Sequence, residues 1–301
     1  MIISTKIPFK RIVEVTWKLN LYTIVYSCFS YLVYVNYLKD HFTMSGAVPG
    51  IMGTAIAFFI GFNNNQAYER WKEARQAWGA LVTDCKSFTR ILLFQSQNPS
   101  DEIVLNKKIL IKRLIALSYA QNYRLRGHAK WEKVSKYLTD SEYNWAKEKT
   151  HVPNAILSLV AKDLYELQQK DIIDEANYLG INEILLNVAR RIGITDRIKG
   201  TVFPTTYDFF TKLFIWLFLT ALTMATEAEM GLWSILNSTM VGFVFIITHQ
   251  VGQALLNPFE WIRTGVPMNQ ICTIIERSLL EMLEETPLPE MEPVIDGQYI
   301  M

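Results

Sequence analysis

The chain has 301 residues, of which 50% are hydrophobic and 20% are charged, and its formal net charge is +1. This balance excludes a nucleic-acid-binding protein, since no stripe of Lys and Arg interleaved with aromatic side chains appears. The mean hydropathy of +0.12 is high for this length, yet too low for a protein that lies wholly in lipid. We therefore expect one part of the chain in a membrane and another part in water.

Four apolar segments are each about long enough to cross a bilayer as a helix. The second segment is rich in Gly and Ala, small residues that let membrane helices approach one another closely. The segments are residues 20–38, 46–65, 206–226 and 231–257. The sequence therefore predicts an all-α membrane protein with four transmembrane helices.

The stretch between the second and third segments is polar, but its apolar residues recur with a helical period. One stripe, for example, consists of Trp71, Ala74, Trp78, Leu81 and Cys85. A break is predicted at 98–101, residues 155–193 form one long helix or two, and no alternating strand pattern appears. We expect four parts: 1–65 and 206–257 in the membrane, a helical cytoplasmic domain over 66–205, and a C-terminal cytoplasmic helix and tail over 258–301.

The distribution of basic residues predicts the orientation in the membrane. Lys and Arg lie before the first apolar segment and after the second, whereas the loops at 39–45 and 227–230 hold one lysine between them. Basic flanks remain in the cytoplasm. We therefore expect a multi-pass protein of the cell inner membrane, with both termini and the middle domain cytoplasmic.

No motif for catalysis or metal binding is present in the sequence. It lacks the nucleophile elbow of hydrolases, and it lacks the HExxH zinc motif and the glycine-rich phosphate loop. Cys28, Cys85 and Cys272 lie too far apart for a zinc site, so we interpret them as buried free thiols. We expect no enzyme, no cofactor and no metal. His249 fits a packing role in the fourth segment, with a pore-facing or proton-linked role as the alternative.

Thr54, Phe58 and Phe62 recur every four residues, so they share one face of the second predicted helix. At about 1.5 Å per residue they cover about 12 Å of the helix axis. If this face lines a symmetric pore, stacked phenylalanine rings form a narrow, dry constriction, which can gate by dewetting. The alternative is that both phenylalanines are ordinary packing residues.

Four consecutive amides, Asn63, Asn64, Asn65 and Gln66, follow this face directly, and the three asparagines are the candidate site residues. Amide side chains are costly in lipid unless they meet water or a partner. They suit the wetted inner mouth of a pore, or they simply mark the point where the helix leaves the membrane.

Three blocks of the sequence resemble a known family of membrane proteins. GFNNNQAYERWKEARQAWGALV, which starts at Gly61, is similar to the end of the second span and the following helix of bacterial bestrophins. RIKGTVFPTTYDFF, which starts at Arg197, resembles that family's approach to its third span. Asn257-Pro258-Phe259, after the fourth segment, also fits the family, and the resemblance covers nearly the whole chain.

The resemblance implies a homo-oligomeric ion channel, a pentamer with one central pore and four membrane-spanning helices per subunit. In that family the second span lines the neck of the pore at the positions that match Thr54, Phe58 and Phe62. Thr54 replaces a bulky apolar residue, so we expect a wider or wetter outer ring. The resemblance also implies a second constriction at the cytoplasmic exit, near residues 176–181, and Ile181 is the candidate.

Calcium and ion selectivity are the remaining expectations. Animal bestrophins bind calcium through an acidic run soon after Asn-Pro-Phe. Residues 260–265 offer one carboxylate near an arginine, which is poor for a cation that takes about six to eight oxygens. We expect no calcium gating. The bacterial resemblance favours small monovalent ions, with cations slightly ahead of anions. The alternatives are a membrane oligomer with a partner-binding or signalling role, and a secondary carrier.

Overall fold

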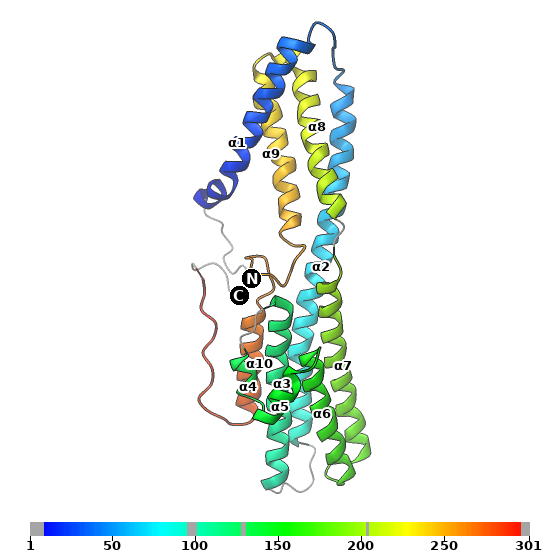
Figure 1. Cartoon of the computed structure of the whole chain (residues 1–301), viewed down its shortest axis with the longest axis vertical. Coiled ribbons are helices and arrows are strands. Elements are labelled where there is room, and N and C mark those ends of the chain that lie inside the picture. The colour runs from blue at the N-terminus through cyan, green and yellow to red at the C-terminus, as the bar shows by residue number, and fades with distance from the viewer. Residues whose placement is uncertain (1–8, 95–100, 128–130, 203–204, 296–301) are drawn as a thin grey trace. The chain divides into compact units, whose positions relative to one another are not determined.

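The computed structural model describes residues 9–94, 101–127, 131–202 and 205–295, which form helices joined by turns (Figure 1). No β-strand occurs within these ranges, so the predicted all-α class is confirmed for the described chain. The described residues divide into two compact units. The apolar unit comprises the residues up to Arg70 and from Val202 to Leu256, and the polar unit comprises Trp71–Thr201 and the residues from Asn257 onward. The predicted division into membrane and cytoplasmic parts stays a prediction.

Each unit is built of helices, and α2 contributes to both. The apolar unit contains α1 (Phe9–Val33), the π-helical turn η1 (Tyr34–Leu38), the first part of α2 (Ala47–Phe94), α8 (Thr205–Met230) and α9 (Trp233–Gln253). The polar unit contains the rest of α2, α3 (Asp101–Arg126), α4 (Glu132–Ser135), α5 (Asp140–Lys147), α6 (Val152–Gln169), α7 (Glu175–Gly200) and α10 (Met268–Met282). The predicted break at 98–101 falls largely outside the described residues, and α3 begins at Asp101.

The core of the apolar unit is small and mostly isoleucine. α8 lies against α9, and both contact α1. The buried residues that form this core are Ile56, Ile60, Ile215, Phe218, Leu219 and Ile246. A Cβ atom on Gly242 would lie 2.3 Å from Leu219 Cδ2, so a larger residue there would force the Leu219 side chain to move.

Helix α1 has the reverse polarity of a surface helix in a soluble protein. Its Thr23, Ser27 and Ser30 side chains are buried, whereas Val25 and Phe29 are exposed. In water an amphipathic helix turns its apolar face toward the core. An exposed apolar face with buried hydroxyls instead suits a helix whose outer surface meets lipid or another subunit.

Three described helices, α2, α8 and α9, are long and apolar enough to cross a membrane. They correspond to the second, third and fourth predicted spans. α1 is less apolar than these three helices, because its tyrosines, serines and threonines lower its hydropathy, and it does not meet the same length and hydropathy criterion. The predicted count of four spans therefore stays a prediction, which the exposed apolar face of α1 supports.

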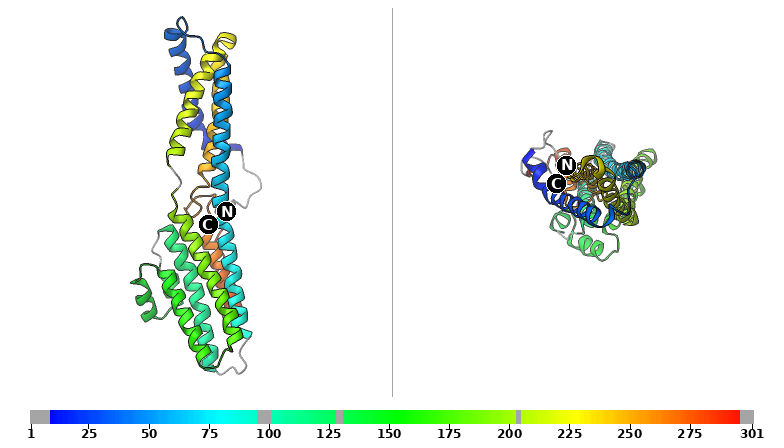
Figure 2. Two further views of the ribbon diagram at one scale, coloured as in Figure 1. Left: turned by 90° about the vertical axis from the view of Figure 1, so that its right-hand side faces the viewer. Right: turned by 90° about the horizontal axis from the view of Figure 1, so that it is seen from above.

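The polar unit has a larger core. α3 packs against α6, α7 and α10, and these helices run lengthwise beside one another (Figure 2). In the predicted stripe of α2, Ala74, Trp78, Leu81 and Cys85 are all buried in this core. Cys85 and Cys272 are buried free thiols, and burial raises the pKa of Cys272 to about 12, so neither thiol ionises at neutral pH.

Residues 152–200 form two helices, α6 and α7. The chain turns at Asp171, whose φ of 53° lies in the left-handed region. The Asp174 side chain then accepts a hydrogen bond from the Asn177 backbone N–H at 2.9 Å and caps the start of α7. Sequence periodicity did not decide whether this segment forms one helix or two. The left-handed turn, followed three residues later by a capping aspartate, divides it into two.

A buried carboxylate, Glu276 on α10, ties three elements of the polar unit together. Tyr119 Oη on α3 donates to Glu276 Oε2 at 2.5 Å, and Tyr137 Oη, just beyond α4, donates to Oε1. Lys136 Nζ lies 3.4 Å from the same Oε1. A buried charge is tolerated only where such partners surround it, so Glu276 has a structural function.

We predict that Glu276→Gln lowers the stability of the protein by about 1–3 kcal/mol, because a neutral amide replaces a charged acceptor of two buried hydroxyls. Glu281→Gln on the same helix is the control, since Glu281 is half exposed and faces only Arg277 at 3.9 Å. Thermal unfolding of the detergent-purified protein compares them. Equal unfolding temperatures for the two variants would contradict the structural function of Glu276.

Candidate pore-lining surface

The first part of α2 exposes a row of side chains along one face. Thr54 is exposed, and Phe58 and Phe62 are 74% and 49% exposed. Residues four apart in a helix lie one above the other, so the three form a continuous strip. Large aromatic side chains left uncovered by the rest of a chain indicate a surface that meets lipid, a partner or a pore.

The opposite face of α2 fixes the direction of this strip. Ile56 and Ile60 are buried and pack with residues of α8 and α9. Two residues further along a helix amounts to about 200° of rotation, so Phe58 points almost directly away from Ile56. The packing of α2 against the apolar unit therefore turns Phe58 and Phe62 outward.

Thr54 stands on this strip with its hydroxyl hydrogen already paired. Its Oγ1 donates to the Gly50 carbonyl oxygen at 3.0 Å, one turn earlier in the same helix. A threonine can therefore occupy an apolar face without an unsatisfied donor.

The predicted inner-mouth amides are not all on this strip. Asn63 is 5% exposed, and its Nδ2 donates to Thr211 Oγ1 on α8 at 3.4 Å. Asn64 Nδ2 donates to the Thr248 carbonyl oxygen on α9 at 2.9 Å. The expectation that all three amides face a wetted mouth is thus corrected for Asn63 and Asn64, which hold α2 to its neighbours. Asn65 alone of the three is exposed.

A polar cluster lies behind the strip, and we call Asn63, Asn64, Asp208, Thr211 and His249 the polar anchor. His249 is 2% exposed, and its Nε2 lies 2.9 Å from Asp208 Oδ1. Asp208 also pairs with Lys212 at 2.7 Å.

Gly252 adds a steric constraint to the polar anchor, because a Cβ there would lie 1.9 Å from Asn64 Oδ1. Sequence analysis singled out His249 as a packing or pore-facing residue but missed its partner Asp208. The available signal was that both are ionisable residues within apolar segments.

Ile181, the candidate for a cytoplasmic constriction, does not face solvent. Its side chain is fully buried in the core of the polar unit, so this expectation is corrected. Ile181, Leu185, Val188 and Ile192 form the buried stripe of α7, with spacings of three and four residues. Within the range 176–181, the exposed large apolar side chain is Leu179, at 58% exposure.

The Arg70-Trp71 block contacts the chain that follows α9. Arg70 Nε donates to the Leu256 carbonyl oxygen at 2.8 Å, and Trp71 Nε1 donates to the Thr264 carbonyl oxygen at 2.6 Å. Within 257–266 the backbone closes on itself, since Val266 N–H donates to the Pro258 carbonyl oxygen at 2.7 Å. Side chains of the first block that carries the sequence resemblance therefore donate hydrogen bonds to residues on either side of the third block, Asn257-Pro258-Phe259.

The described residues hold no group of three His, Cys, Asp or Glu side chains placed to bind a metal ion. In the 260–265 segment the carbonyl oxygens of Glu260 and Ile262 accept backbone hydrogen bonds from Ile262 and Gly265, at 2.8 and 2.9 Å. Carbonyl oxygens committed in this way are less available to a cation. The absence of calcium gating stays a prediction.

Comparison with known proteins places this geometry in context. The model of the bacterial and fungal bestrophin protein family matches residues 7–281. The voltage-dependent anion channel-forming protein YneE of Escherichia coli strain K12 is 25% identical over 258 residues, which cover 86% of this chain and 83% of that protein. A similarly named protein, alr2987 of Nostoc sp. strain PCC 7120, is 22% identical over 244 residues, which cover 81% of this chain and 78% of its own length.

The fold is also similar to a solved structure. The crystal structure of a bacterial bestrophin homologue from Klebsiella pneumoniae superposes with a TM-score of 0.82 at 23% identity, over 89% of this chain and 98% of that one. At this identity the likeness establishes the fold and no more.

We predict that Asn64→Ala lowers the stability of the protein by about 1 kcal/mol, because it removes the hydrogen bond between α2 and α9. Asn65→Ala, one residue further on the exposed side of the same helix, should change stability little. The measurement is the thermal unfolding temperature of each detergent-purified variant. A larger loss at Asn65 than at Asn64 would show that the two amides have been assigned to the wrong faces.

Proposed function

Since the chain belongs to the bacterial and fungal bestrophin family, we propose that it is a subunit of a membrane ion channel whose copies enclose one central pore. One observation carries this proposal: the strip of Thr54, Phe58 and Phe62 stays exposed after α2 has packed against the apolar unit. In a symmetric homo-oligomer every exposed residue is repeated around the axis, so the strip becomes a stack of rings.

The proposed neck works as a hydrophobic gate. Rings of Phe58 and Phe62 are bulky and cannot hydrogen-bond to water, so a narrow ring of them favours an empty, non-conducting pore. The Thr54 ring, smaller and carrying an oxygen, is wider and more easily wetted. Ions therefore lose most of their hydration at Phe58 and Phe62, and these two residues set the barrier.

We propose monovalent anions as the permeant ions. The relatives from E. coli and Nostoc carry the name of anion channels. The slight preference for cations in the sequence analysis is at odds with these names, and it is not retained. A phenylalanine ring is electropositive at its edge, so rings whose edges point into the pore attract an anion without the tight binding of a full charge.

The proposed assembly is a homo-pentamer in the inner membrane with both termini in the cytoplasm. The pentamer follows from the family resemblance, and the orientation follows from the basic residues that flank the first two apolar segments. The exposed apolar residues of α1, such as Val25 and Phe29, supply a surface for lipid or a neighbouring subunit. Native mass measurement in detergent counts the subunits.

For a second constriction we propose Leu179 in place of Ile181. Leu179 lies on the first turns of α7, within the predicted range, and its side chain is exposed while that of Ile181 is buried. Only an exposed side chain can reach the axis of an oligomer.

Planar-bilayer recording of the purified protein under a KCl gradient tests the proposed function. We expect currents that reverse close to the chloride equilibrium potential. Reversal near the potassium potential would refute anion conduction while leaving the neck intact. A protein that carries no current would favour a partner-binding or signalling oligomer, and saturable uptake of an organic solute would favour a carrier.

We predict that Phe58→Ala and Phe62→Ala each raise single-channel conductance severalfold, because a methyl group leaves a wider, wetter ring. Phe59→Ala is a matched control on the same helix: Phe59 is 41% exposed, but its ring lies beside those of Phe214 and Tyr207 of α8, at ring distances of 6.4 and 6.5 Å. It should leave conductance unchanged. Unaltered currents in both Phe58 and Phe62 variants would rule out the proposed neck.

A further inference from the structure

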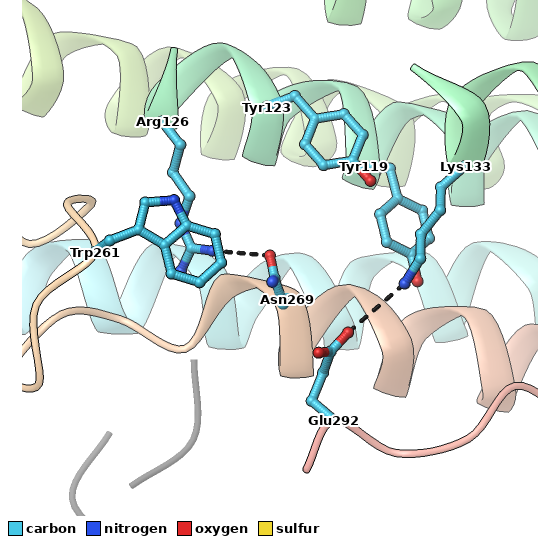
Figure 3. A pocket seen from close by; sticks show the side chains of 7 residues that line it. All are labelled: Tyr119, Tyr123, Arg126, Lys133, Trp261, Asn269 and Glu292. Carbon is cyan, nitrogen blue, oxygen red and sulfur yellow. Dashed lines mark hydrogen bonds and ion pairs between the residues drawn. The ribbon is translucent and has the colours of Figure 1, made fainter. Parts of the chain in front are cut away.

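A cavity of about 390 Å³ lies within the polar unit (Figure 3). Its walls include the aromatic rings of Tyr119, Tyr123 and Trp261 and the cationic side chains of Arg126 and Lys133. This volume is in the range of sites that hold small organic molecules, which are also typically lined by aromatic surface with a few polar groups.

Arg126, at the end of α3, has an incomplete set of partners. Its guanidinium lies 3.8 Å from the centre of the Trp261 ring, and its Nη1 donates to Asn269 Oδ1 at 2.8 Å (Figure 3). Its Nε and Nη2 are buried and make no hydrogen bond to any residue that the structure describes. Those two nitrogens form one edge of the guanidinium, the edge that matches the two oxygens of a carboxylate.

Arg113, on the same helix, shows how the protein treats a buried arginine that has a structural function. Its Nη1 lies 2.5 Å from Asp163 Oδ2, and its Nη2 pairs with Glu142. Its Nε, like that of Arg126, is buried without a hydrogen bond to any described residue, so the contrast between the two arginines lies in the carboxylates. Arg126 has no such carboxylate, although burial lowers its pKa only to about 10, so that it remains charged at neutral pH. A buried cation without an anionic partner is costly, which indicates that its partner comes from outside the chain.

The other end of the cavity is electrostatically balanced. Lys133 Nζ lies 3.6 Å from Glu292 Oε1 and 5.0 Å from the centre of the Tyr119 ring. Glu292 is the acidic side chain among the lining residues, so two cations face one carboxylate and Arg126 retains the excess positive charge. The hydroxyl of Tyr119 is committed to Glu276, which leaves its ring to face the cavity.

We propose that this cavity binds a small organic monocarboxylate with a flat apolar body. The carboxylate pairs with the Nε–Nη2 edge of Arg126, and the body lies against the rings of Tyr119 and Tyr123. An inorganic anion would satisfy Arg126 but leave most of the volume unfilled, since a water-sized species takes up only about 30 Å³. The site is independent of which ion the channel passes.

Trp261 controls access to the Arg126 edge. It lies on the irregular segment between α9 and α10 and is 47% exposed, although its ring stacks on the guanidinium. Because the two unpaired nitrogens are covered, the ligand must displace a neighbouring group, and Trp261 is the side chain best placed to move. Binding should therefore change tryptophan fluorescence.

Benzoate is a suitable probe, with benzyl alcohol as its uncharged counterpart, and the full-length protein in detergent is titrated with each. Ligand-observed NMR and tryptophan fluorescence report binding. We expect saturable binding of benzoate, with a Kd on the order of 0.1–1 mM for so small a ligand, and at least tenfold weaker binding of benzyl alcohol. Absence of saturable benzoate binding, or equal affinity for the two probes, would overturn the proposal.

Arg126→Gln should weaken benzoate binding by at least tenfold, the loss expected for one charge-assisted pair. Arg124→Gln is the matched control, because Arg124 lies two residues earlier on α3 and pairs with Asp196 at 3.4 Å; it should bind as the unmodified protein does. If Arg126→Gln does not assemble, Trp261→Leu is tested in its place, and we expect a severalfold loss of benzoate affinity. Unchanged benzoate affinity in whichever of the two variants is tested would refute the site.

Discussion

The polar anchor behind α2 is the interaction on which the exposed strip depends. Lipid offers no hydrogen-bond partners, so the amides of Asn63 and Asn64 must turn toward α8 and α9, where they find Thr211 and the Thr248 carbonyl. Turning these amides inward fixes the rotation of the whole helix. Phe58 and Phe62 lie on the other side of the helix and therefore point outward. A polar requirement in the interior thus sets the position of the apolar residues that we propose to meet the ions.

Buried polar groups have different kinds of hydrogen-bond partners in the two units. In the apolar unit, hydroxyls such as those of Thr223 and Ser238 pair with one another or with backbone carbonyls, and the buried His249 pairs with Asp208. In the polar unit buried charges occur in compact networks, such as Arg113 with its two carboxylates and Glu276 with its two tyrosines. Arg126 departs from this pattern, and that contrast within one helix distinguishes a ligand-binding arginine from a structural one.

Sequence patterns predicted the features that depend on periodicity alone. The four-residue spacing of Thr54, Phe58 and Phe62 placed them on one face, and the stripe through Trp78 and Cys85 predicted the core side of α2. The sequence could not predict features that depend on the rotation of a helix about its axis, or on contacts between residues far apart in the chain. Polarity identified Asn63 and Asn64 as unusual but not the direction in which they point. Asp208 lies far from His249 in the sequence, so no local pattern joins them. Ile181 was placed by counting back from Pro204 on the strength of the family resemblance, although its own buried stripe in α7 would have assigned it to the core.

The hydroxyl groups of the apolar unit bear on how the protein is made. Thr23 Oγ1 donates to the Leu19 carbonyl at 2.8 Å, and Thr223 and Thr239 make the same bond, one turn back, on α8 and α9. α1 leaves the ribosome well before α8 and α9 exist, so a Thr23 hydroxyl that depended on those helices would enter the bilayer unpaired. Because these three threonines pair with carbonyls of their own helices, their hydroxyls are satisfied before the helices meet. Tyr26 and Ser30 of α1 instead pair with Thr220 of α8, so these contacts form only when the two helices assemble.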